Sequence, residues 1–391
     1  MNPFWSKDST VKPQSLSRVL IIHPFGLGDA LFITPVIRAL KENGVKQIDL
    51  LLGSRTRELF ETNPHVNQIF EWDKSPLEEA REQWDRFKKL AALFHTIWNN
   101  RYQAVFDFSP RAQYAFLALA VFWIPIRIGF NFKSRGFFLT HKLELSEGYR
   151  GKPVVEYYLN LLDFFGIQPA NKRPELFLSE RDQGDGQALI KKLGIDAPRR
   201  TFIAVVPGGG ESWGKDARLK RWPIEHFVGL IRSLHDRYDD LCETVLILGG
   251  SNEYSLGTQL LQKLKGMRVH NLCGAASIRV IASVIQNASI LIGNDGGLVH
   301  IAHAVGTPVV AIYGPADPIV YGPYPSDSKA LIITKEGPAC RPCYQRFRYQ
   351  SACSGVECLT ELKPEQVLER LQARHFFDQL NFSMASQGKK Q

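Results

Sequence analysis

The sequence predicts an α/β protein built around parallel β-sheets. Short apolar runs rich in β-branched residues alternate with longer stretches of helical periodicity, a pattern typical of parallel sheets. With 391 residues, the chain is too long for one ordinary core and suits two domains. Four of the apolar runs lead directly into glycine, which indicates ligand-binding loops at the carboxyl edge of a sheet.

The first half begins with a strand and a helix joined by a glycine-containing turn. The strand is predicted over Arg18–His23 and the helix over Asp29–Asn43. Two further strands are predicted over Gln47–Leu52 and Ala104–Phe108. The stretch Ser75–Asn99 between them is rich in Glu, Lys, Arg and Leu at helical spacing, which predicts a long amphipathic surface helix.

The second half repeats this alternation. The predicted strands are Phe202–Val206, Thr244–Leu248, Ser289–Ile292 and Pro308–Tyr313, each followed by glycine within a few residues. Between the two halves, Phe165–Asp196 contains Pro, Gly and many charges and is interpreted as a linker. We therefore expect an N-terminal domain over residues 1–175 and a C-terminal domain over 176–391.

Composition excludes several classes of protein. Hydrophobic residues make up 44% and charged residues 22%, so the chain is not expected to be disordered or fibrous. The net charge of +9 suits anionic partners, but the basic residues are too dispersed to predict nucleic-acid binding. Six cysteines are too few to imply an oxidising compartment.

No targeting or membrane-spanning segment is evident in the sequence. The first 17 residues lack an apolar core, and the longest apolar run, Tyr114–Ile126, spans 13 residues and is interrupted by Pro125. A run of this length predicts a buried helix. We expect a cytoplasmic protein whose association with a membrane, if any, is peripheral.

The turn after the first strand reads His-Pro-Phe-Gly-Leu-Gly-Asp-Ala. Gly26 and Gly28 fit a dinucleotide fingerprint, but the third glycine position is Leu31, which disfavours a nicotinamide cofactor. The turn delivers Asp29 to the start of the helix. An N-cap and a catalytic carboxylate explain Asp29 equally well.

The loop Pro207–Pro223 reads PGGGESWGKDARLKRWP. Three glycines allow the backbone to approach a ligand, and four cations follow them, a combination typical of phosphate binding outside the Walker class. Two tryptophans are expected to anchor the charged loop. The residues concerned are Gly208, Gly209, Gly210, Trp213, Lys215, Arg218, Lys220, Arg221 and Trp222.

Two further strand ends carry polar residues. GNDGGLVH places Asp295 at a predicted helix start, where exposed amides suit a pyrophosphate, and puts His300 and His303 on the helix that follows. After another strand, Glu253 could accept hydrogen bonds from ribose hydroxyls. Each histidine on its own is more typical of a core residue than of a ligand.

Four cysteines lie near the C-terminus with the spacing C-x-x-C-x₉-C-x₄-C. A structural zinc site is one interpretation, but the second pair lacks the compact spacing of a zinc knuckle, so reduced thiols are favoured. The residues are Cys340, Cys343, Cys353 and Cys358.

Taken together, these motifs resemble those of the bacterial heptosyltransferases, glycosyltransferase family 9. The resemblance covers VLIIHPFGLGDALFITPVIRALKE, TNPHVNQIFEWDK, YQAVFDF, IRIGF, VVPGGGESWGKDARLKRWPIEHF, ILGGSNE, IGNDGGLVHIAHAVGTPVVAIYGPADP and the Cys-rich PACRPCYQRF…CL segment. It implies a glycosyltransferase B fold, with two Rossmann-like domains facing across a cleft. The N-terminal domain would bind the acceptor and the C-terminal domain the nucleotide sugar, and a last helix over Lys363–Gln379 could return to the first domain.

The resemblance also implies an activity and residue roles. The donor would be ADP-L-glycero-β-D-manno-heptose, and the acceptor a lipid A-linked lipopolysaccharide inner core. Asp29 matches the general base of an inverting displacement, and Lys220 the lysine that neutralises the departing ADP. Glu253 matches the ribose-binding glutamate. Asp295, Gly297 and His300 match the D-x-G-x-x-H signature that holds the diphosphate and sugar, and no essential metal or cofactor is expected.

The sequence departs from the family at Gly296, where a threonine is usual, and at Gly208–Gly210, where small polar residues are usual. A different nucleotide sugar or acceptor, or a non-catalytic nucleotide-sugar-binding homologue, therefore stays open as an alternative.

Basic residues of the first half are expected to meet phosphates of the lipid-anchored acceptor and anionic headgroups at the inner membrane. Gly28, Lys133 and Arg135 are the predicted acceptor-binding residues, and a monomer that binds no nucleic acid is expected. The whole basic set is Arg127, Lys133, Arg135, His141, Lys142, Arg150 and Lys152.

Overall fold

The computed structural model describes the backbone of residues 16–72, 80–195, 201–210, 214–238, 242–349, 353, 355–374 and 376. Within these ranges, the side chains of 80–87 and of Lys215 are not described. Trp213, residues 75–79 of the predicted long helix and the C-terminal tail from residue 377 lie outside the described residues.

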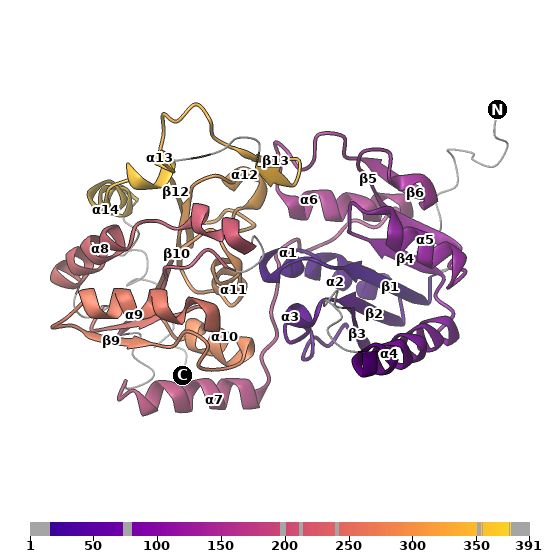
Figure 1. Ribbon diagram of the computed structural model, residues 1–391, viewed down its shortest axis with the longest axis horizontal. Coiled ribbons are helices and arrows are strands. Elements are labelled where there is room, and N and C mark those ends of the chain that lie inside the picture. Colours follow the sequence, from indigo (N-terminus) through magenta and orange to yellow (C-terminus); the bar gives the residue numbers. More distant parts are fainter. Residues whose placement is uncertain are drawn as a thin grey trace. The chain divides into compact units, whose positions relative to one another are not determined.

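Contacts divide the described chain into two compact units (Figure 1). The first contains the residues up to Phe25 and then Phe32–Pro174. The second contains Glu175 onward together with the short segment Gly26–Leu31, which groups with it although it lies early in the sequence.

The first unit contains a parallel six-stranded sheet in the order β3-β2-β1-β4-β5-β6. This is the strand order of a Rossmann fold, whose connection reverses between β1 and β4. The core lies between the sheet and its helices because the central strands are buried along their length. The strands are β1 Arg18–His23, β2 Gln47–Leu52, β3 Gln68–Glu71, β4 Ala104–Asp107, β5 Ile126–Asn131 and β6 His141–Glu144.

Helices flank this sheet. From Ala80 to Asn99, α4 agrees with the predicted long helix. The helices are α2 Thr34–Glu42, α3 Ser54–Arg57, α4 Ala80–Asn99, α5 Ala112–Ala120, α6 Val154–Leu159, and the 3₁₀ segments η2 Gly136–Phe138 and η3 Asn160–Phe165.

The second unit repeats the same topology with a parallel sheet in the order β12-β11-β10-β7-β8-β9. Its reversal point lies between β7 and β10. The prediction of an α/β fold with two Rossmann-like domains is thus confirmed. The strands are β7 Phe202–Val206, β8 Thr244–Ile247, β9 Arg268–Asn271, β10 Ile290–Asn294, β11 Val309–Tyr313 and β12 Ala330–Thr334, with a small hairpin of β13 Tyr344–Gln345 and β14 Arg348–Tyr349.

The helices of the second unit fill its core from both faces of the sheet. They are α1 Leu27–Leu31, α7 Glu180–Lys192, η4 Gly214–Lys220, α8 Ile224–Arg237, η6 Ser251–Glu253, α9 Tyr254–Lys263, α10 Ile278–Gln286, α11 Gly297–Ala304, α12 Pro318–Tyr321, α13 Glu357–Thr360 and α14 Pro364–Ala373.

The single helix predicted over Asp29–Asn43 is wrong, because the chain forms α1 and then α2 as separate helices. Pro35 stands in the first turn of α2. Proline has no N–H to donate and its ring clashes with the preceding helical turn, so it favours the start of a new helix over the continuation of an old one.

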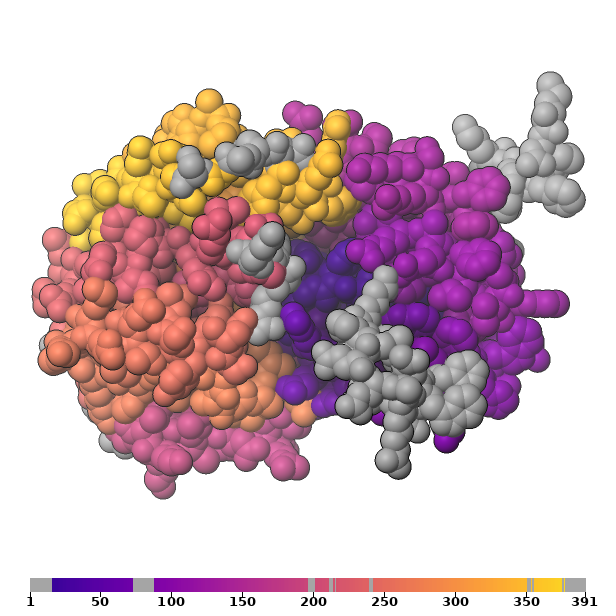
Figure 2. All heavy atoms as spheres, in the orientation of Figure 1, coloured from indigo at the N-terminus to yellow at the C-terminus, as the bar shows by residue number. Residues whose placement is uncertain are grey.

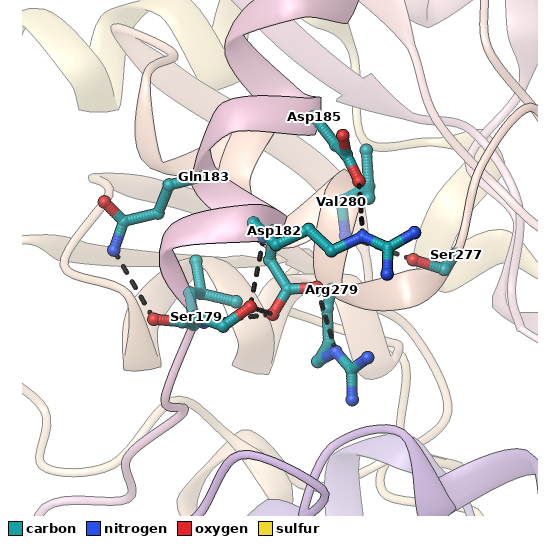
Figure 3. Close-up of polar contacts among 9 residues, drawn as sticks. Ser179, Asp182, Gln183, Asp185, Ser277, Arg279 and Val280 are labelled. Atoms are coloured by element: carbon teal, nitrogen blue, oxygen red, sulfur yellow. Dashed lines mark hydrogen bonds and ion pairs between the residues drawn. The ribbon is translucent and has the colours of Figure 1, made fainter.

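The linker predicted over Phe165–Asp196 contains the helix α7, which packs on α10 in the second unit. Ser179 and Asp182 form a capping box at its start, and the Asp182 carboxylate also accepts from Arg279 Nε at 3.1 Å (Figure 3). Gly186 allows the close approach, because a Cβ there would overlap the side chain of Ser283. Gly186, within the predicted linker, thus serves helix–helix packing.

The apolar run Tyr114–Ile126 forms α5 and the loop after it, but it is not a wholly buried helix as predicted. Tyr114 and Ala118 are buried, whereas Phe116 and Leu119 are exposed. Of the helices that the structure describes, none has the length and hydropathy required to span a bilayer.

The last described helix, α14, packs against α8 and β12 of the second unit. Figures 1 and 2 show these yellow C-terminal residues along the same side of that unit as α8. Trp222 strengthens this packing, since its buried indole Nε1 donates to the Leu362 carbonyl just before α14 at 2.8 Å.

Candidate functional site

The glycine-rich loop after β7 and the acidic loop after β10 meet at the reversal point of the second sheet. The buried amide of Asn294 joins them: its Nδ2 donates to the carbonyls of Pro207 at 2.8 Å and Gly208 at 3.1 Å. Its Oδ1 accepts from the backbone N–H of Trp222 at 3.0 Å. Sequence reasoning did not select Asn294, although its place at the end of a buried strand was the available signal.

Lys220 and Asp295 form a buried ion pair at this junction. Lys220 Nζ lies 2.8 Å from Asp295 Oδ2, and each side chain is 7% exposed. Lys220 ends η4, and the adjacent Trp222 is 1% exposed, as expected for the anchor of this loop. A buried pair of opposite charges supplies a localised positive group without leaving an isolated charge in the interior.

Asp29 lies in the first turn of α1 and is half-buried. Burial raises the pKa of its carboxyl to about 6 from an ordinary 3.8. The cation of Lys220 opposes this rise in pKa, and the negative charge of Asp295 adds to it. A helix start favours the ionised form of a carboxyl, but the larger effect of desolvation makes Asp29 a stronger base.

Two glycines bring α1 against the start of α11. A Cβ on Gly28 would lie 2.6 Å from His300 Cδ2, and a Cβ on Gly297 would lie 2.8 Å from the Cβ of Leu27. Neither position has room for a side chain. These two glycines explain why Gly26–Leu31, with Asp29 inside it, groups with the second unit.

His300 is 7% exposed, and burial lowers its pKa to about 4. The negative charge of Asp295 raises the pKa, whereas His303 and Lys220 lower it. His300 is therefore neutral at physiological pH and can donate a hydrogen bond but supplies no charge. His303 on the same helix pairs through Nε2 with Asp327 Oδ1 at 3.2 Å.

Glu253 is buried and connects two loops. Its Oε1 accepts from the N–H of Gly210 at 3.1 Å, and its Oε2 from the N–H of Gly250 at 3.0 Å. Each carboxylate oxygen accepts more than one hydrogen bond, so these contacts leave room for a ligand hydroxyl.

The three consecutive glycines after β7 serve different purposes. A Cβ on Gly208 would overlap the carboxylate of Glu253, and one on Gly209 would overlap the carbonyl of Ala217. Gly210 has φ +73°, in the left-handed region that favours glycine. Gly296 differs from them: its backbone is extended, and the nearest atom to an added Cβ lies 3.6 Å away, so a Cβ fits there.

Two tyrosines that the sequence did not single out interact electrostatically with the carboxylates of the site. Tyr313 ends β11, and Tyr344 stands on the β13–β14 hairpin. For both phenols burial is the main cause of a raised pKa, to which Asp29 and Asp295 add. The N–H of Tyr344 donates to the Pro315 carbonyl at 3.2 Å, which attaches the hairpin to the loop after β11.

The Cys-rich segment leads into this hairpin, and its cysteines are free thiols in the structure. Arg341, between two of them, donates to the carbonyls of Gly314 at 2.6 Å and Lys335 at 2.8 Å. No group of three or more His, Cys, Asp or Glu side chains within the described ranges is placed to hold a metal ion.

The predicted acceptor residues Lys133 and Arg135 are exposed in the first unit. Arg127 was expected on the same basic surface, and that prediction is wrong. Its guanidinium is buried and donates to the carbonyls of Ile124, Pro125 and Phe138 at 2.7–3.0 Å. Three carbonyl partners offset the cost of burying a charged group, so Arg127 is structural.

Comparison with known proteins places these features in context. Residues 90–350 match the sequence profile of glycosyltransferase family 9 (heptosyltransferase). Lipopolysaccharide heptosyltransferase 2 of Escherichia coli K12 is 24% identical over 366 residues, which is 91% of this chain and 98% of the relative. Lipooligosaccharide heptosyltransferase 2 of Campylobacter jejuni is 25% identical over 90% of this chain and 98% of its own.

Solved structures are similar over nearly the whole chain. A family 9 glycosyltransferase from Veillonella parvula covers 95% of this chain and all of its own with a TM-score of 0.75 at 19% identity. The E. coli ADP-heptose lipopolysaccharide heptosyltransferase II covers 93% of this chain and 99% of its own with a TM-score of 0.68 at 23% identity. These similarities agree with the predicted fold class.

Proposed function

Because the chain belongs to glycosyltransferase family 9 (heptosyltransferase), we propose that it transfers heptose from ADP-L-glycero-β-D-manno-heptose to a lipopolysaccharide inner core. The family makes it a glycosyltransferase, and the relatives named above are lipopolysaccharide or lipooligosaccharide heptosyltransferases. The single observation that carries the mechanism is a carboxyl with a pKa of about 6, Asp29, which interacts electrostatically with the Lys220–Asp295 pair.

Asp29 is the proposed general base. Its carboxylate takes the proton of an acceptor hydroxyl while that oxygen forms a bond to the anomeric carbon of the heptose. The bond from that carbon to the β-phosphate oxygen breaks at the same time, and ADP leaves on the opposite face. A single displacement of this kind inverts the anomeric configuration. The raised pKa supports the assignment, since a base works best with a pKa close to the working pH.

Lys220 is proposed to neutralise the negative charge that develops on the departing diphosphate. Its ammonium is fixed by Asp295 in a buried environment, where an oriented charge stabilises a transition state more effectively than in water. The role of Asp295 is then to hold Lys220 and to keep its charge compensated before the donor binds.

The remaining donor contacts are assigned by the loops that surround this pair. Backbone amides of Gly208, Gly209, Gly296 and Gly297 are proposed to donate to the diphosphate, and neutral His300 to the diphosphate or the sugar. The N–H of Gly210 instead donates to Glu253. Glu253 is proposed to accept from the ribose. Its two backbone partners hold the carboxylate in one orientation and support this role.

The acceptor is proposed to bind through the first unit, where exposed Lys133 and Arg135 offer cations to its phosphates. We further propose that the enzyme acts as a monomer at the cytoplasmic face of the inner membrane, where a lipid A-linked acceptor would be presented. No metal or cofactor is assigned a part in the reaction.

A donor screen tests this proposal. The purified protein is given ADP-heptose, or another nucleotide sugar, with a Kdo-containing core acceptor, and ADP release is followed with and without acceptor. Asp29→Asn is the test variant, and Asp236→Asn, which changes an exposed carboxylate on α8, is the matched control. Nuclear magnetic resonance of the product reports its anomeric configuration.

Acceptor-dependent ADP release that is lost in Asp29→Asn but kept in Asp236→Asn, with an inverted product, is the expected result. Release with another nucleotide sugar alone would refute ADP-heptose as donor. Full activity of Asp29→Asn would refute the assigned base, and a retained configuration would refute the single displacement.

A further inference from the structure

One region of the first unit exposes large apolar side chains. Six such side chains are at least two-fifths exposed in the described part of the chain, and four of them lie within residues 116–137. They are Phe116, 46% exposed; Leu119, 40%; Trp123, 72%; and Phe137, 82%. We call these four residues the apolar patch.

The patch is formed by α5, the loop after it and η2. Phe116 and Leu119 lie one turn apart on the same side of α5. The ring of Phe138 contacts Phe116 and Phe137, with centroid separations of 5.2 and 5.4 Å, and so joins α5 to η2. Trp123 follows α5, and its ring makes an edge-to-face contact with that of Trp98, with ring centroids 5.8 Å apart.

The backbone beneath the patch is fixed. The buried guanidinium of Arg127 donates to Ile124 and Pro125 just after Trp123, and to Phe138 just after Phe137. Asn131 Oδ1 accepts from the Gly136 N–H at 2.9 Å and holds the other end of η2. One buried cation thus fastens both segments that present exposed rings.

Three residues of the loops between α5 and η2 have a backbone conformation that is unusual for residues other than glycine. Trp123 has φ +52°, and the pair Lys133 and Ser134 has φ +52° and +59°. Left-handed conformations cost free energy in residues with a Cβ, most of all in bulky ones, and tend to persist at functional positions. Here they occur at an exposed indole and an exposed lysine, Trp123 and Lys133.

The exposed charges within residues 101–143 are all positive, whereas Glu144 just beyond them is exposed and accepts from Asn131 Nδ2 at 2.9 Å. Residues 101–143 contain six Lys or Arg residues and one carboxylate, Asp107, which is 2% exposed. Arg127 is buried, so the exposed charges of this segment are all positive. They belong to Arg101, Arg111, Lys133, Arg135 and Lys142.

We propose that the apolar patch and these five exposed cations dock the protein on a bilayer that carries anionic lipid headgroups. Tryptophan and phenylalanine favour the interface between headgroups and acyl chains, and nearby cations are attracted to anionic lipids. A second copy of this chain fits poorly, because a symmetric contact would set the five cations against their equivalents. The inference takes one premise from the proposed function, namely that the acceptor is lipid-anchored, so that docking would bring the enzyme close to it.

Vesicle co-sedimentation of the full chain tests this inference. The protein is mixed with vesicles of phosphatidylcholine alone, or of phosphatidylcholine with phosphatidylglycerol, without donor or acceptor. Trp123→Ser/Phe137→Ser removes the two most exposed rings. Tyr254→Ser/Ile319→Ser is the matched control, because it removes two large apolar side chains of the second unit that are 57% and 62% exposed.

We expect binding to the anionic vesicles, about tenfold weaker in Trp123→Ser/Phe137→Ser and unchanged in the control. Arg101→Gln/Arg111→Gln should reduce the preference for phosphatidylglycerol, as should added salt. Equal binding of all variants, or no preference for anionic vesicles, would overturn the proposal. So would a dimer in light scattering that the ring variant abolishes, since the patch would then bind a second copy.

Transfer assays separate this inference from the proposed function. On a water-soluble, deacylated core acceptor, Trp123→Ser/Phe137→Ser should turn over like the unmodified protein, which also reports correct folding. On acceptor embedded in anionic vesicles, its turnover should fall. If no heptose is transferred to the soluble acceptor, the proposed function fails, whereas vesicle binding continues to test the docking surface by itself. Should the ring variant melt early, Phe137→Ser alone repeats the test.

Discussion

Lys220 Nζ lies 2.8 Å from Asp295 Oδ2 in an environment where both side chains are 7% exposed. The two residues are 75 positions apart, and each ends up at the reversal point of the second sheet through its own glycine-containing loop. Their pairing fixes the position of the Lys220 ammonium, and the two charges act in opposite directions on the pKa of Asp29.

Removing one partner of this pair should lower the stability of the folded protein. Lys220→Met leaves Asp295 buried without its partner and is expected to lower the free energy of unfolding by about 3–5 kcal/mol. The double variant Lys220→Met/Asp295→Asn should recover much of that loss in urea denaturation, while donor binding stays weak in both. If the double variant is no more stable than Lys220→Met, the loss of stability in Lys220→Met does not come from the unpaired charge of Asp295.

The rate of transfer should depend on the ionisation of Asp29. Since only the carboxylate accepts a proton, turnover should fall as the pH drops below about 6, and Asp29→Asn should lose roughly 10²- to 10⁴-fold. Lys220 holds the pKa of Asp29 down, so the residual activity of Lys220→Met should show its acidic limb at higher pH. A pH profile of each enzyme measures both effects. An acidic limb at the same pH in both enzymes would show that Lys220 does not influence the pKa of Asp29.

The same pKa has a consequence for stability. The carboxyl of Asp29 has a higher pKa in the folded protein than its ordinary 3.8, so the folded state loses stability as the pH rises from about 4 to about 6. Asn has no charge to bury. Asp29→Asn should therefore melt at a higher temperature than the unmodified protein at neutral pH, with the difference shrinking towards pH 4. A difference that is independent of pH would count against a buried ionised carboxylate.

Neighbouring glycines should respond differently to substitution. Gly297→Ala and Gly28→Ala introduce a Cβ within 2.8 Å of α1 or His300, and each should destabilise by about 1–3 kcal/mol. Gly296→Thr places its Cβ at least 3.6 Å from other atoms in an extended backbone, and should stay within about 0.5 kcal/mol. Thermal melts and donor affinities of the three variants check this. Unfolding of Gly296→Thr would show that the loop does not accept the threonine usual in the family.

Glu253 has two roles to separate, a structural one and a proposed ribose contact. In Glu253→Gln, the amide nitrogen faces one of the two backbone N–H groups that the carboxylate accepts from, so stability should fall by about 1–3 kcal/mol. If Glu253 also binds ribose, the unmodified protein should prefer ADP over 2′-deoxy-ADP, and the variant should lose that preference. Calorimetry with both nucleotides measures it, and an unchanged preference would leave Glu253 structural.

Lys133 and Arg135 should affect the acceptor and not the donor. The double variant Lys133→Gln/Arg135→Gln is expected to raise the acceptor KM roughly fivefold, the sum of two exposed ion pairs, with the donor KM unchanged. Lys46→Gln/Lys172→Gln, which changes two exposed lysines of the same unit outside the predicted basic set, is the control. A rise in both KM values, or in neither, would contradict the acceptor assignment.

Most of the sheet architecture could be predicted from the sequence. The ranges Arg18–His23, Gln47–Leu52 and Phe202–Val206 are strands with the predicted bounds, because a fully buried parallel strand is a continuous apolar run. The outer strands β3, β6, β9 and β12 and the inner strand β5 were not predicted. Strands β3, β6 and β9 are short and alternate with polar residues, so no apolar run marks them.

The sequence by itself determined the alternation of strands and helices, the glycine loops that follow the strands, and the motif set that identifies the family. These are local properties, because hydrophobic periodicity and turn chemistry depend on residues close together in the chain. Tertiary structure alone decided the protonation of Asp29 and His300 and the burial of Arg127. Desolvation and charge come from groups distant in sequence, and only the folded chain brings those groups together.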